Sequence, residues 1–369
     1  MILHLLHYDH ATGRQFASYV IKQFSSPDLF SEFVFITEST DVDFPSHQKV
    51  RFINSNDLVS FHGLLDSLVN YSGLILHGLF YPWCEDVLNS VPENVKVAWM
   101  FWGGEIYGRD DRFLAPLSKM AERLHGLLKG RSKSKEWALP KKAFQRINYC
   151  LTGEMEEYEY AKQYLDSKNL QFIWYTYYSI EETVGALYNS HCQGNGVCLC
   201  NSATIGNNMF DAVAKFSLPR YRAIFKEREI LMPLSYGAPW IRNAMLKICP
   251  MVFGASFHPL LEFVPRDEYN KLILNCSTMI LPHYRPGGQG NILTALWLGM
   301  RVYLSNQNLS YVYFKRLGVK IYSIESDFKE YGCQPMAEKD VQENRRILTR
   351  WYGRQHIEEA CKSVVAILN

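Results

Sequence analysis

The stretch of residues 278–304 constrains the fold of this chain more than any other. Residues 278–281 form an apolar run typical of a buried strand, and a short loop with three glycines follows. Residues 291–298 carry apolar side chains at helical spacing, and residues 301–304 have the pattern of a second strand. Strand, glycine loop, helix and strand in this order predict one βαβ unit of a mainly parallel sheet.

The glycine loop has the composition of a phosphate site. Glycine lets the backbone approach an anion, and the free N–H groups at the start of the next helix point towards it. An ordinary strand-to-helix turn also uses glycine, and the loop is neither a Walker loop nor a dinucleotide fingerprint, so both interpretations stay open. The candidate contacts to a donor diphosphate are His283, Arg285, Gly287, Gly288, Gln289, Gly290 and Asn291.

Strands alternate with helices through the rest of the chain as well. The 369 residues are enough for two domains of ordinary size. We interpret the polar residues 179–196 as the linker between two Rossmann-like halves. The expected strands are residues 2–7, 33–37, 50–53, 74–76, 95–100, 148–151 and 171–175 in the first half, and 196–200, 228–234, 251–253, 278–281, 301–304 and 321–324 in the second.

Two such domains that face each other across a cleft suit an enzyme that passes a nucleotide-linked group to an acceptor. Open α/β sheets bind ligands at the carboxyl ends of their strands. We expect residues 1–185 to bind the acceptor and residues 190–335 to bind the donor. Residues 336–369 are expected to form the C-terminal helices, and the helix around residues 340–351 could cross back to the first domain.

Polar and aromatic residues follow several strands of the first half. Glu105 is the leading candidate for a general base, because it lies at a strand exit in a glycine-containing turn; a capping or salt-bridged surface carboxylate is the alternative. His77, after the preceding strand, is the second candidate, and a hydrogen-bonded structural histidine is its alternative. The expected acceptor contacts are Asp9, His10, Gly13, Gly78, Phe80, Trp102, Gly103, Gly104 and Tyr107.

The loop of residues 201–208 is rich in short polar side chains at a strand-to-helix junction of the second half. Such side chains can bind ribose, phosphate or sugar hydroxyls, although Ser and Asn are also preferred at helix N-termini. We expect no metal, so the charge of a nucleoside diphosphate leaving group falls to the helix dipole, backbone N–H groups and Arg285. The further donor contacts are Asn201, Ser202, Thr204, Asn207, Asn208, Tyr236 and Gly237.

Charge and composition exclude several classes of protein. The net charge of +2 gives no general basic field for nucleic acid. The chain contains no apolar run of spanning length, and its start lacks the features of a signal peptide. We therefore expect a cytosolic protein or one bound to the cytosolic face of a membrane, with its nine cysteines reduced. The cluster of His191, Cys192, Cys198 and Cys200 lacks the usual spacing of a zinc site.

Positive charge is concentrated in residues 119–146. This segment has nine Lys or Arg against two Glu, a local net charge of +7, while the whole chain carries +2. Interleaved Leu and Trp residues favour a patch that binds anionic lipid, and a solvated basic surface is the alternative. The predicted membrane patch consists of Lys129, Arg131, Lys133, Lys135, Trp137, Lys141 and Lys142.

Five short motifs, in order, resemble one enzyme family. They are His-Gly-x-Phe from His77, Trp-Gly-Gly-Glu-x-Tyr from Trp102, Asn-Ser and Asn-Asn from Asn201 and Asn207, Pro-Leu-Ser-Tyr-Gly ending at Gly237, and Gln-Gly with a later Gly from Gln289. In this order they are similar to the 4-acetamido-4,6-dideoxygalactosyltransferases, the TDP-N-acetylfucosamine:lipid II transferases of glycosyltransferase family 56. The family members carry Trp-Gly-Ala-Asp where this chain has Trp-Gly-Gly-Glu.

The resemblance implies an α/β fold of the GT-B type and a transferase that needs no metal or other cofactor. It implies a dTDP- or UDP-linked amino-deoxy sugar as donor and an undecaprenyl-pyrophosphate-linked saccharide as acceptor. The expected location is the cytoplasmic face of the bacterial inner membrane, in synthesis of common antigen, O-antigen or capsule. A nucleotide-sugar 2-epimerase on the same fold and a non-catalytic partner protein with this fold are the alternatives.

Overall fold

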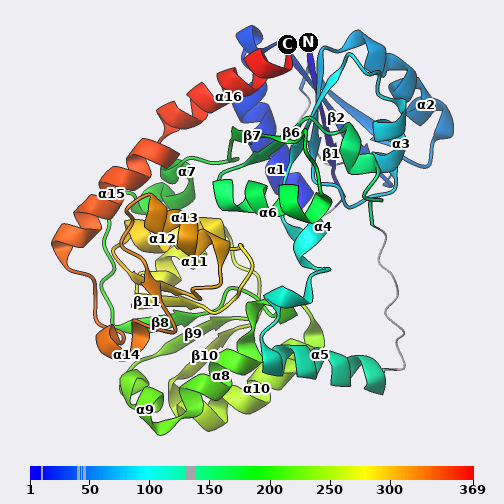
Figure 1. Ribbon diagram of the computed structural model, residues 1–369. Helices are drawn as coiled ribbons and strands as arrows, with labels where there is room; N and C mark the ends of the chain where they lie inside the picture. The colour runs from blue at the N-terminus through cyan, green and yellow to red at the C-terminus, as the bar shows by residue number, and fades with distance from the viewer. Residues whose placement is uncertain (10, 40–41, 43, 45–46, 130–137) are drawn as a thin grey trace. The chain divides into compact units, whose positions relative to one another are not determined.

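The computed structural model describes residues 1–9, 11–39, 42, 44, 47–129 and 138–369 (Figure 1). The chain divides into two compact units, each made of several segments. Unit 1 comprises Met1–Ile106, Lys135–Ser179 and Arg354–Asn369, and unit 2 comprises Tyr107–Ser134 and Ile180–Gly353.

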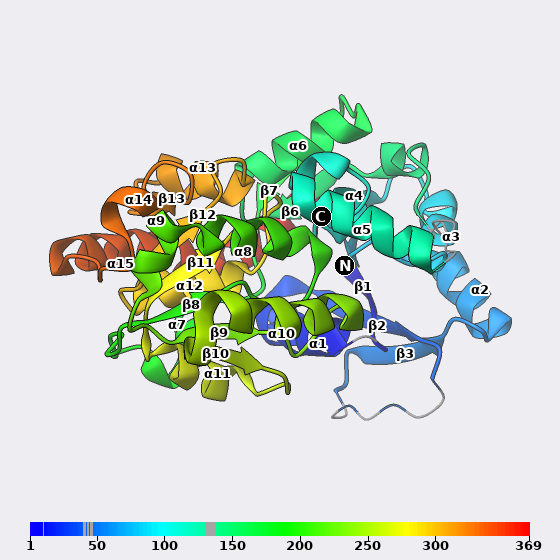
Figure 2. The same cartoon turned by 90° about the horizontal axis from the view of Figure 1, so that it is seen from below.

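Unit 1 is built on a seven-stranded parallel sheet in the order β3-β2-β1-β4-β5-β6-β7. Figure 2 shows β1, β2 and β3 side by side. The strands are β1 (Ile2–His7), β2 (Ser31–Thr37), β3 (Val50–Asn54), β4 (Gly73–His77), β5 (Lys96–Met100), β6 (Tyr149–Thr152) and β7 (Gln171–Trp174). Its helices are α1 (Ala11–Phe24), α2 (Leu58–Ser67), α3 (Trp83–Ser90), α6 (Met155–Leu165) and α16 (Arg354–Leu368), and α4 (Gly104–Tyr107) ends at its border.

Unit 2 is built on a six-stranded parallel sheet in the order β10-β9-β8-β11-β12-β13. The strands are β8 (Gly196–Leu199), β9 (Ile230–Pro233), β10 (Phe257–Leu260), β11 (Cys276–Leu281), β12 (Arg301–Leu304) and β13 (Tyr322–Ser323). The helices are α5 (Pro116–Leu128), α7 (Ile180–Val184), α8 (Met209–Ser217), α9 (Pro219–Arg222), α10 (Pro239–Phe253), α11 (Arg266–Ile273), α12 (Gln289–Trp297), α13 (Leu309–Arg316), α14 (Phe328–Tyr331) and α15 (Glu338–Tyr352).

Every residue of β1, β4, β8, β11 and β12 is buried. Strands covered on both faces read as continuous apolar runs, which is why these strands could be predicted from the sequence. The order of strands reverses between β1 and β4 in unit 1 and between β8 and β11 in unit 2. Such switch points are where open α/β sheets bind ligands, so the loops after these four strands are the first places to search.

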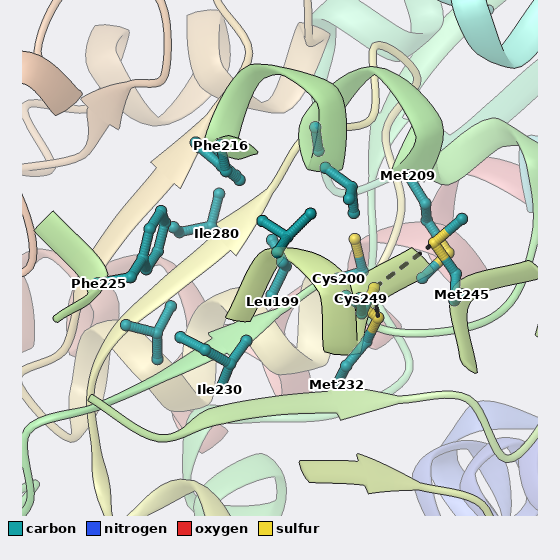
Figure 3. Packing of buried hydrophobic residues seen from close by; sticks show 14 of the residues in the cluster. Leu199, Cys200, Met209, Phe216, Phe225, Ile230, Met232, Met245, Cys249 and Ile280 are labelled. Carbon is teal, nitrogen blue, oxygen red and sulfur yellow. Dashed lines mark hydrogen bonds between the residues drawn. The ribbon is translucent and has the colours of Figure 1, made fainter. Parts of the chain in front are cut away.

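The core of unit 2 is rich in aromatic and sulfur-containing side chains (Figure 3). Phe216 and Phe225 pack edge to face at 5.0 Å between ring centroids. The thiol of Cys249 lies 3.9 Å from the sulfur of Met232 and 4.0 Å from that of Met245. Polarizable sulfur adapts to irregular gaps, so these side chains fill the space beneath α10 without any disulfide; all nine cysteines are free thiols.

The predicted strand at residues 251–253 is wrong. These residues form the last turn of α10, which continues past Pro250 and ends at Phe253, with Gly254 as its C-cap. The buried face of α10 consists of Ile241, Met245, Cys249 and Val252, and this spacing is helical. A three-residue apolar run fits either structure, and the helix prevails because it extends a face that is already buried. The strand of this region is β10, which begins four residues later, at Phe257.

The predicted domain boundaries also need correction. Residues 180–187 form α7 and a short 3-10 helix that belong to unit 2, rather than the end of the first domain or a linker. The side chain of Asn270 donates to the carbonyl oxygens of Thr183 (3.2 Å) and Val184 (3.4 Å). These hydrogen bonds are buried, so they attach the start of the predicted linker to α11.

Residues 107–134, predicted in the first domain, belong to unit 2. The reason is a helix cap supplied from a distant part of the chain. The carboxylate of Asp211 on α8 accepts hydrogen bonds from the backbone N–H groups of Leu117 (2.8 Å) and Ser118 (2.7 Å) and from the Ser118 hydroxyl (2.7 Å). These groups begin α5, whose first N–H groups have no partner within the helix. A carboxylate there also complements the helix dipole.

The two C-terminal helices belong to different units. The helix predicted around residues 340–351 is α15; it stays in unit 2, and the following helix, α16, belongs to unit 1. Ile357, Cys361 and Val364 of α16 are part of the core of unit 1. The end of α16 lies beside the N-terminus (Figure 1), where the Ser72 hydroxyl bonds both the Met1 carbonyl (3.1 Å) and the side chain of Asn369 (2.7 Å).

Candidate functional site

The glycine loop of unit 2 ends at the N-terminus of α12, at the switch point between β8 and β11. Gly288 is the N-cap residue and has a left-handed backbone with φ of 65°. The first turn of α12 contains no acidic residue. The helix dipole and the first N–H groups therefore offer an uncompensated positive end to a ligand.

Arg285 places a guanidinium beside this helix end. The side chain is partly buried, and its Nε lies so close to Gly206 that a Cβ atom there would be 2.6 Å away. Burial lowers the pKa of Arg285, while the hydroxyls of Tyr236 and Tyr107 act in the opposite direction. Within the described part of the chain, no carboxylate lies within 4.0 Å of this guanidinium. A partly buried cation without a counter-ion is a candidate anion-binding group.

His283 supports the loop. Its Nε2 lies 3.1 Å from the carbonyl oxygen of Gly287, and burial, with a smaller effect of Arg285, lowers the pKa of His283 to about 3. The imidazole is therefore neutral and donates Nε2–H to that carbonyl. The side chain of Asn308 donates to the carbonyl oxygens of His283 (2.9 Å) and Arg285 (3.0 Å). We conclude that His283 and Asn308 shape the loop, rather than contribute a second positive charge to a ligand.

The loop after β8 reaches the same place through Asn201. A Cβ atom on Gly288 would lie 2.5 Å from the Nδ2 of Asn201, so glycine allows this amide to lie against the loop. Ser202 and Thr204 face each other, with 3.3 Å between their hydroxyl oxygens. Asn207 donates to the carbonyl (2.6 Å) and the hydroxyl (2.9 Å) of Ser202. Asn207 is thus used inside the loop, and Asn201, Ser202 and Thr204 remain its candidate ligand contacts.

Asn208 is also a structural residue. Its Nδ2 donates to the carbonyl of Phe113 (3.2 Å), and its Oδ1 accepts from the N–H of Ala115 (2.9 Å). Its backbone is left-handed, with φ of 51°. The side chain therefore attaches the segment before α5 to the loop after β8, and the prediction that Asn208 contacts the donor finds no support in this geometry.

The remaining predicted donor residues surround this loop pair. Tyr236 is exposed and Gly237 forms a parallel bridge with Ala203, which joins the loops after β8 and β9. Gln289 lies 3.5 Å from the hydroxyl of Tyr352. Gly290 and Asn291 lie in the first turn of α12. Tyr107, predicted to contact the acceptor, belongs to unit 2 instead. Its hydroxyl is close enough to Arg285 to affect the pKa of the guanidinium.

Unit 1 has its own cluster at the ends of β4 and β5. Glu105 is buried, with Oε1 within hydrogen-bond distance of the backbone N–H groups of Leu79 (3.3 Å) and Trp102 (3.4 Å) and of the Trp99 indole (3.2 Å). Its Oε2 is buried without a hydrogen-bond partner in the described residues. Burial raises the pKa of Glu105 to about 7, although these donors favour the charged form. The carboxyl links two loops and changes protonation near neutral pH.

His77 lies in a buried chain of hydrogen bonds and not at the surface. Its Nδ1 is 2.8 Å from the Tyr177 hydroxyl and its Nε2 is 3.1 Å from Nδ1 of His4. The Tyr177 oxygen also accepts from the Trp102 indole at 2.8 Å. The other end of the chain reaches the hydroxyl of Ser31, 3.3 Å from Nε2 of His4.

The groups at its ends determine which atoms donate and which accept along this chain of hydrogen bonds. The Ser31 hydroxyl donates to the carbonyl of Leu29, so it accepts from Nε2–H of His4. Nδ1 of His4 then accepts from Nε2–H of His77, and Nδ1 of His77 accepts from the Tyr177 hydroxyl. Burial lowers the pKa of both histidines, to about 3 for His77, so both rings are neutral. His77 is therefore a structural histidine that holds Trp102 through Tyr177, and it is not placed to act as a base.

Aromatic rings line the exit of these strands. A Cβ atom on Gly78 would lie 3.1 Å from Trp102 and 3.0 Å from Phe80, and one on Gly104 would lie 3.0 Å from Phe80. The two glycines thus let partly exposed rings lie against the backbone. Gly103, directly before Gly104, has a positive φ of 86°. Aromatic faces of this kind can stack on the apolar face of a sugar.

The loop after β1 is stabilised by its own contacts. Asp9 accepts hydrogen bonds from the Thr37 hydroxyl and from the N–H of Glu38 (2.5 Å), which joins the ends of β1 and β2. Gly13 lies directly against the carbonyl of His7, where no side chain would fit. Asp9 and Gly13 are thus engaged within the protein, and His10 lies outside the described residues.

The predicted membrane patch is described only in part. Lys129 is exposed just after α5, and Lys142 is exposed in unit 1. Lys141 donates to the carbonyl of Tyr164 (2.8 Å) and lies 4.4 Å from the centre of its ring. Arg131, Lys133, Lys135 and Trp137 lie outside the described residues. Among the helices that the structure describes, none is long and apolar enough to cross a bilayer.

The expectation of a metal-free site is still a prediction. The chain contains one Asp-x-Asp triplet, Asp41 to Asp43, which is the usual metal-carrying motif of metal-dependent sugar transferases. Both aspartates lie outside the described residues. Cys198 and Cys200 of the possible zinc cluster are buried, and the Cys198 thiol lies 3.6 Å from the hydroxyl of Tyr269.

Sequence reasoning missed Tyr177, His4, Asp211 and Asn308. Tyr177 and His4 lie in runs that read as ordinary apolar strand neighbours, and their partners are far away in the chain. Asp211 caps a helix from almost a hundred residues away, and no local pattern could show it. Asn308 could have been found, because Asn is a common N-cap residue and Asn308 directly precedes α13. The sequence could therefore have predicted that its side chain bonds the backbone.

No protein family model matches the chain, and none of the curated proteins is similar in sequence. Solved structures are similar in fold. Sucrose-phosphate synthase from Thermosynechococcus elongatus has a TM-score of 0.57 at 10% identity, covering 100% of this chain and 94% of that chain. The UDP-forming α,α-trehalose-phosphate synthase from Burkholderia xenovorans, solved with glucose-6-phosphate, has a TM-score of 0.59 at 9% identity, covering 100% of both chains.

HepE from Anabaena, solved with UDP and glucose, has a TM-score of 0.59 at 9% identity over 99% of both chains. The chain has the GT-B fold. This confirms the predicted α/β class, with two parallel sheets that each carry a switch point. In this GT-B chain the glycine loop and Arg285 belong to the second unit, and the Trp-Gly-Gly-Glu turn belongs to the first.

Proposed function

We propose that the protein is a glycosyltransferase that uses a nucleotide-sugar donor. The observation that carries the proposal is Arg285, a partly buried guanidinium without a carboxylate partner in the described residues, beside the N-terminus of α12. A nucleoside diphosphate leaving group needs positive charge at this place, and the helix end and Arg285 supply it together. HepE was solved with UDP and glucose on the same fold.

The donor in this proposal is a dTDP- or UDP-linked amino-deoxy sugar of the 4-acetamido-4,6-dideoxygalactose type. The five ordered motifs that resemble glycosyltransferase family 56 support this choice. The acceptor is an undecaprenyl-pyrophosphate-linked saccharide of a bacterial surface polysaccharide, and the enzyme works at the cytoplasmic face of the inner membrane. The basic segment of residues 119–146 supports this location.

The first unit binds the acceptor in this proposal. Trp102 and Phe80 offer ring faces to a saccharide. Glu105 is the proposed base, because a carboxyl with a pKa of about 7 can accept a proton from a hydroxyl near neutral pH. Both of its oxygens are buried here. The proposal therefore requires the turn around Gly104 to open when the acceptor binds.

The first experiment measures thermal stability with dTDP, UDP, GDP, ADP, CMP or NAD, each with and without magnesium. A ligand at a hundred times its dissociation constant stabilises a folded protein by about 2.7 kcal/mol. We expect a shift with dTDP or UDP that does not depend on magnesium and is lost in Arg285→Ala. Arg222→Ala is the control, because Arg222 is an exposed arginine of the same unit.

A shift in both variants would mean that the nucleotide binds elsewhere. No shift with any nucleotide would refute the proposed donor site and favour a non-catalytic protein with a GT-B fold. Conversion of a nucleotide sugar to its 2-epimer without an acceptor would identify an epimerase instead.

A further inference from the structure

An apolar groove lies between three helices of unit 2. It has a volume of about 290 Å³ and is lined by α5, α8 and α10, which Figure 1 shows close together. Leu117, Met120 and Leu124 of α5 form one wall. Phe210 and Ala214 of α8 belong to the other side, and the remaining lining residues are apolar or small as well.

The apolar face of α5 continues beyond the groove into solvent. Leu127 is 78% exposed and Leu128 is 87% exposed, and Met120 and Leu124 are also exposed. These positions recur every three or four residues, so they form one stripe along the helix. Large side chains that stay exposed next to an apolar hollow indicate a surface that is covered by another molecule.

The position of α5 is well determined by the protein itself. Asp211 caps its first turn through three hydrogen bonds, and His125 stacks on Trp240 with 4.3 Å between ring centroids. The helix is therefore docked on α8 and α10 at both its start and its C-terminal half. The stripe is therefore exposed on a helix that is firmly packed against its own unit.

The charges around the stripe select one class of occupant. Lys119 lies 2.9 Å and Arg123 lies 3.8 Å from the carboxylate of Asp111, and Lys129 follows the helix. In the sequence, residues 130–137, directly after the helix, add three more Lys or Arg against one Glu. A protein partner would need an acidic surface with an apolar ridge. A bilayer with anionic head groups offers both properties over any area.

We propose that α5 lies in the interface of an anionic membrane and that the groove binds one hydrocarbon chain of a lipid. One water molecule needs roughly 10–15 Å³ of such a cavity, so a volume of about 290 Å³ has room for a segment of a hydrocarbon chain. A polyprenyl chain offers such a segment, and in that respect the inference rests on the proposed lipid-linked acceptor. The stripe and the basic residues hold the enzyme on the surface where such a substrate is found.

The first test is sedimentation with vesicles made of equal parts phosphatidylcholine and phosphatidylglycerol. The protein should sediment with them, and should stay in the supernatant with pure phosphatidylcholine. Leu127→Ser combined with Leu128→Ser should weaken binding about tenfold for each leucine. Phe263→Ser is the matched control, because Phe263 is 80% exposed in the same unit but outside the stripe. Equal loss in the control would overturn the assignment of the stripe.

The second test separates the groove from the stripe. cis-Parinaric acid, a fatty acid whose fluorescence rises in apolar surroundings, should bind the wild-type protein. Ala214→Phe should reduce its binding about tenfold or more, because the new ring occupies the groove. The variant should still sediment with the vesicles, since Leu127 and Leu128 are unchanged. Undiminished parinaric acid binding in this variant would overturn the groove as a lipid site.

The same variants distinguish this inference from the proposed function. Both should keep the thermal shift with dTDP or UDP, which also shows that they are folded. A nucleotide shift without vesicle or parinaric acid binding would overturn the lipid site and leave the transferase proposal in place. Light scattering that shows a dimer, lost in Leu127→Ser with Leu128→Ser, would identify a second copy of the chain as the occupant and would also overturn the lipid site.

Discussion

The buried carboxyl of Glu105 should give the protein an unusual dependence of stability on pH. The carboxyl has an ordinary pKa of 4.5, which burial raises to about 7 in the folded protein. Folding therefore disfavours the charged form. The contribution of the protonated carboxyl to stability is complete below pH 4.5 and is lost as the pH rises through 7. The interval between the two values corresponds to ~3 kcal/mol of unfolding free energy.

The substitution Glu105→Gln isolates this effect. The amide keeps a carbonyl oxygen in the place of Oε1, which accepts from Leu79, Trp99 and Trp102, and it puts an uncharged group in the place of Oε2. At pH 4.5 the variant and the wild type should have nearly equal stability. At about pH 8 the variant should be more stable by ~3 kcal/mol, because the wild type then contains a buried charge.

Urea unfolding at the two pH values measures this difference. Trp99 and Trp102 contact the carboxyl, so their fluorescence reports the unit in which it lies. If Glu105 is the base, the variant should also lose transferase activity while it gains stability. An equal difference at both pH values, or a variant that is less stable at high pH, would contradict the raised pKa and with it the proposed base.

Three further predictions follow from other contacts. Tyr177→Phe keeps the ring stacked on Phe16 but leaves His77 and the Trp102 indole without the shared oxygen, so unfolding free energy should fall by ~3 kcal/mol, as measured in urea. Asp211→Asn should weaken the cap of α5 by ~1 kcal/mol and speed hydrogen exchange of the Leu117 and Ser118 amides, with little effect elsewhere. Gly288→Ala puts a Cβ atom on a residue with a positive φ and against the Asn201 amide, so it should abolish the thermal shift with nucleotide. Gly254→Ala, at a similar φ but in open space, should leave that shift unchanged.

The outcome for Gly288→Ala has its own internal control. Both glycines have a positive φ, but Gly288 has a left-handed backbone (φ 65°, ψ 28°), whereas Gly254 (φ 61°, ψ −139°) lies in a region that is essentially restricted to glycine. The backbone strain of Gly254→Ala is therefore at least as large as the ~1 kcal/mol of Gly288→Ala. Only Gly288 lies near a side chain. Equal loss of nucleotide binding in both variants would mean that strain, and not the approach of Asn201, explains the glycine.

The central strands of both sheets could be predicted because they are buried on both faces. Residues 2–7 and residues 301–304 were predicted at the bounds that β1 and β12 have in the structure. The predicted helix at residues 291–298 overlaps α12, which begins two residues earlier. The false strand at residues 251–253 shows the limit of this reasoning, because a short apolar run fits a helix equally well when its neighbours continue the helical spacing.

The loops after strands could be predicted as ligand sites only in outline. The guanidinium of Arg285 and the amide of Asn201 both lie against the glycine-containing loops, and their contacts to a donor stay predictions. His77, His283, Asn207 and Asn208 had the right residue types, but their side chains bond atoms of the protein itself. A polar side chain at a strand exit can face the ligand or support the loop. The choice depends on neighbours that are distant in the chain.

By itself, the sequence determined the fold class, the central strands and the place of the glycine loop, since these depend on local burial patterns and on the conformational needs of glycine. Only the tertiary structure decided which unit residues 107–134 belong to, that His77 is neutral, and that Arg285 has no carboxylate partner in the described residues. These properties depend on distances between atoms far apart in the sequence. Burial and the position of a partner determine charge and chemistry, and both arise only when the chain has folded.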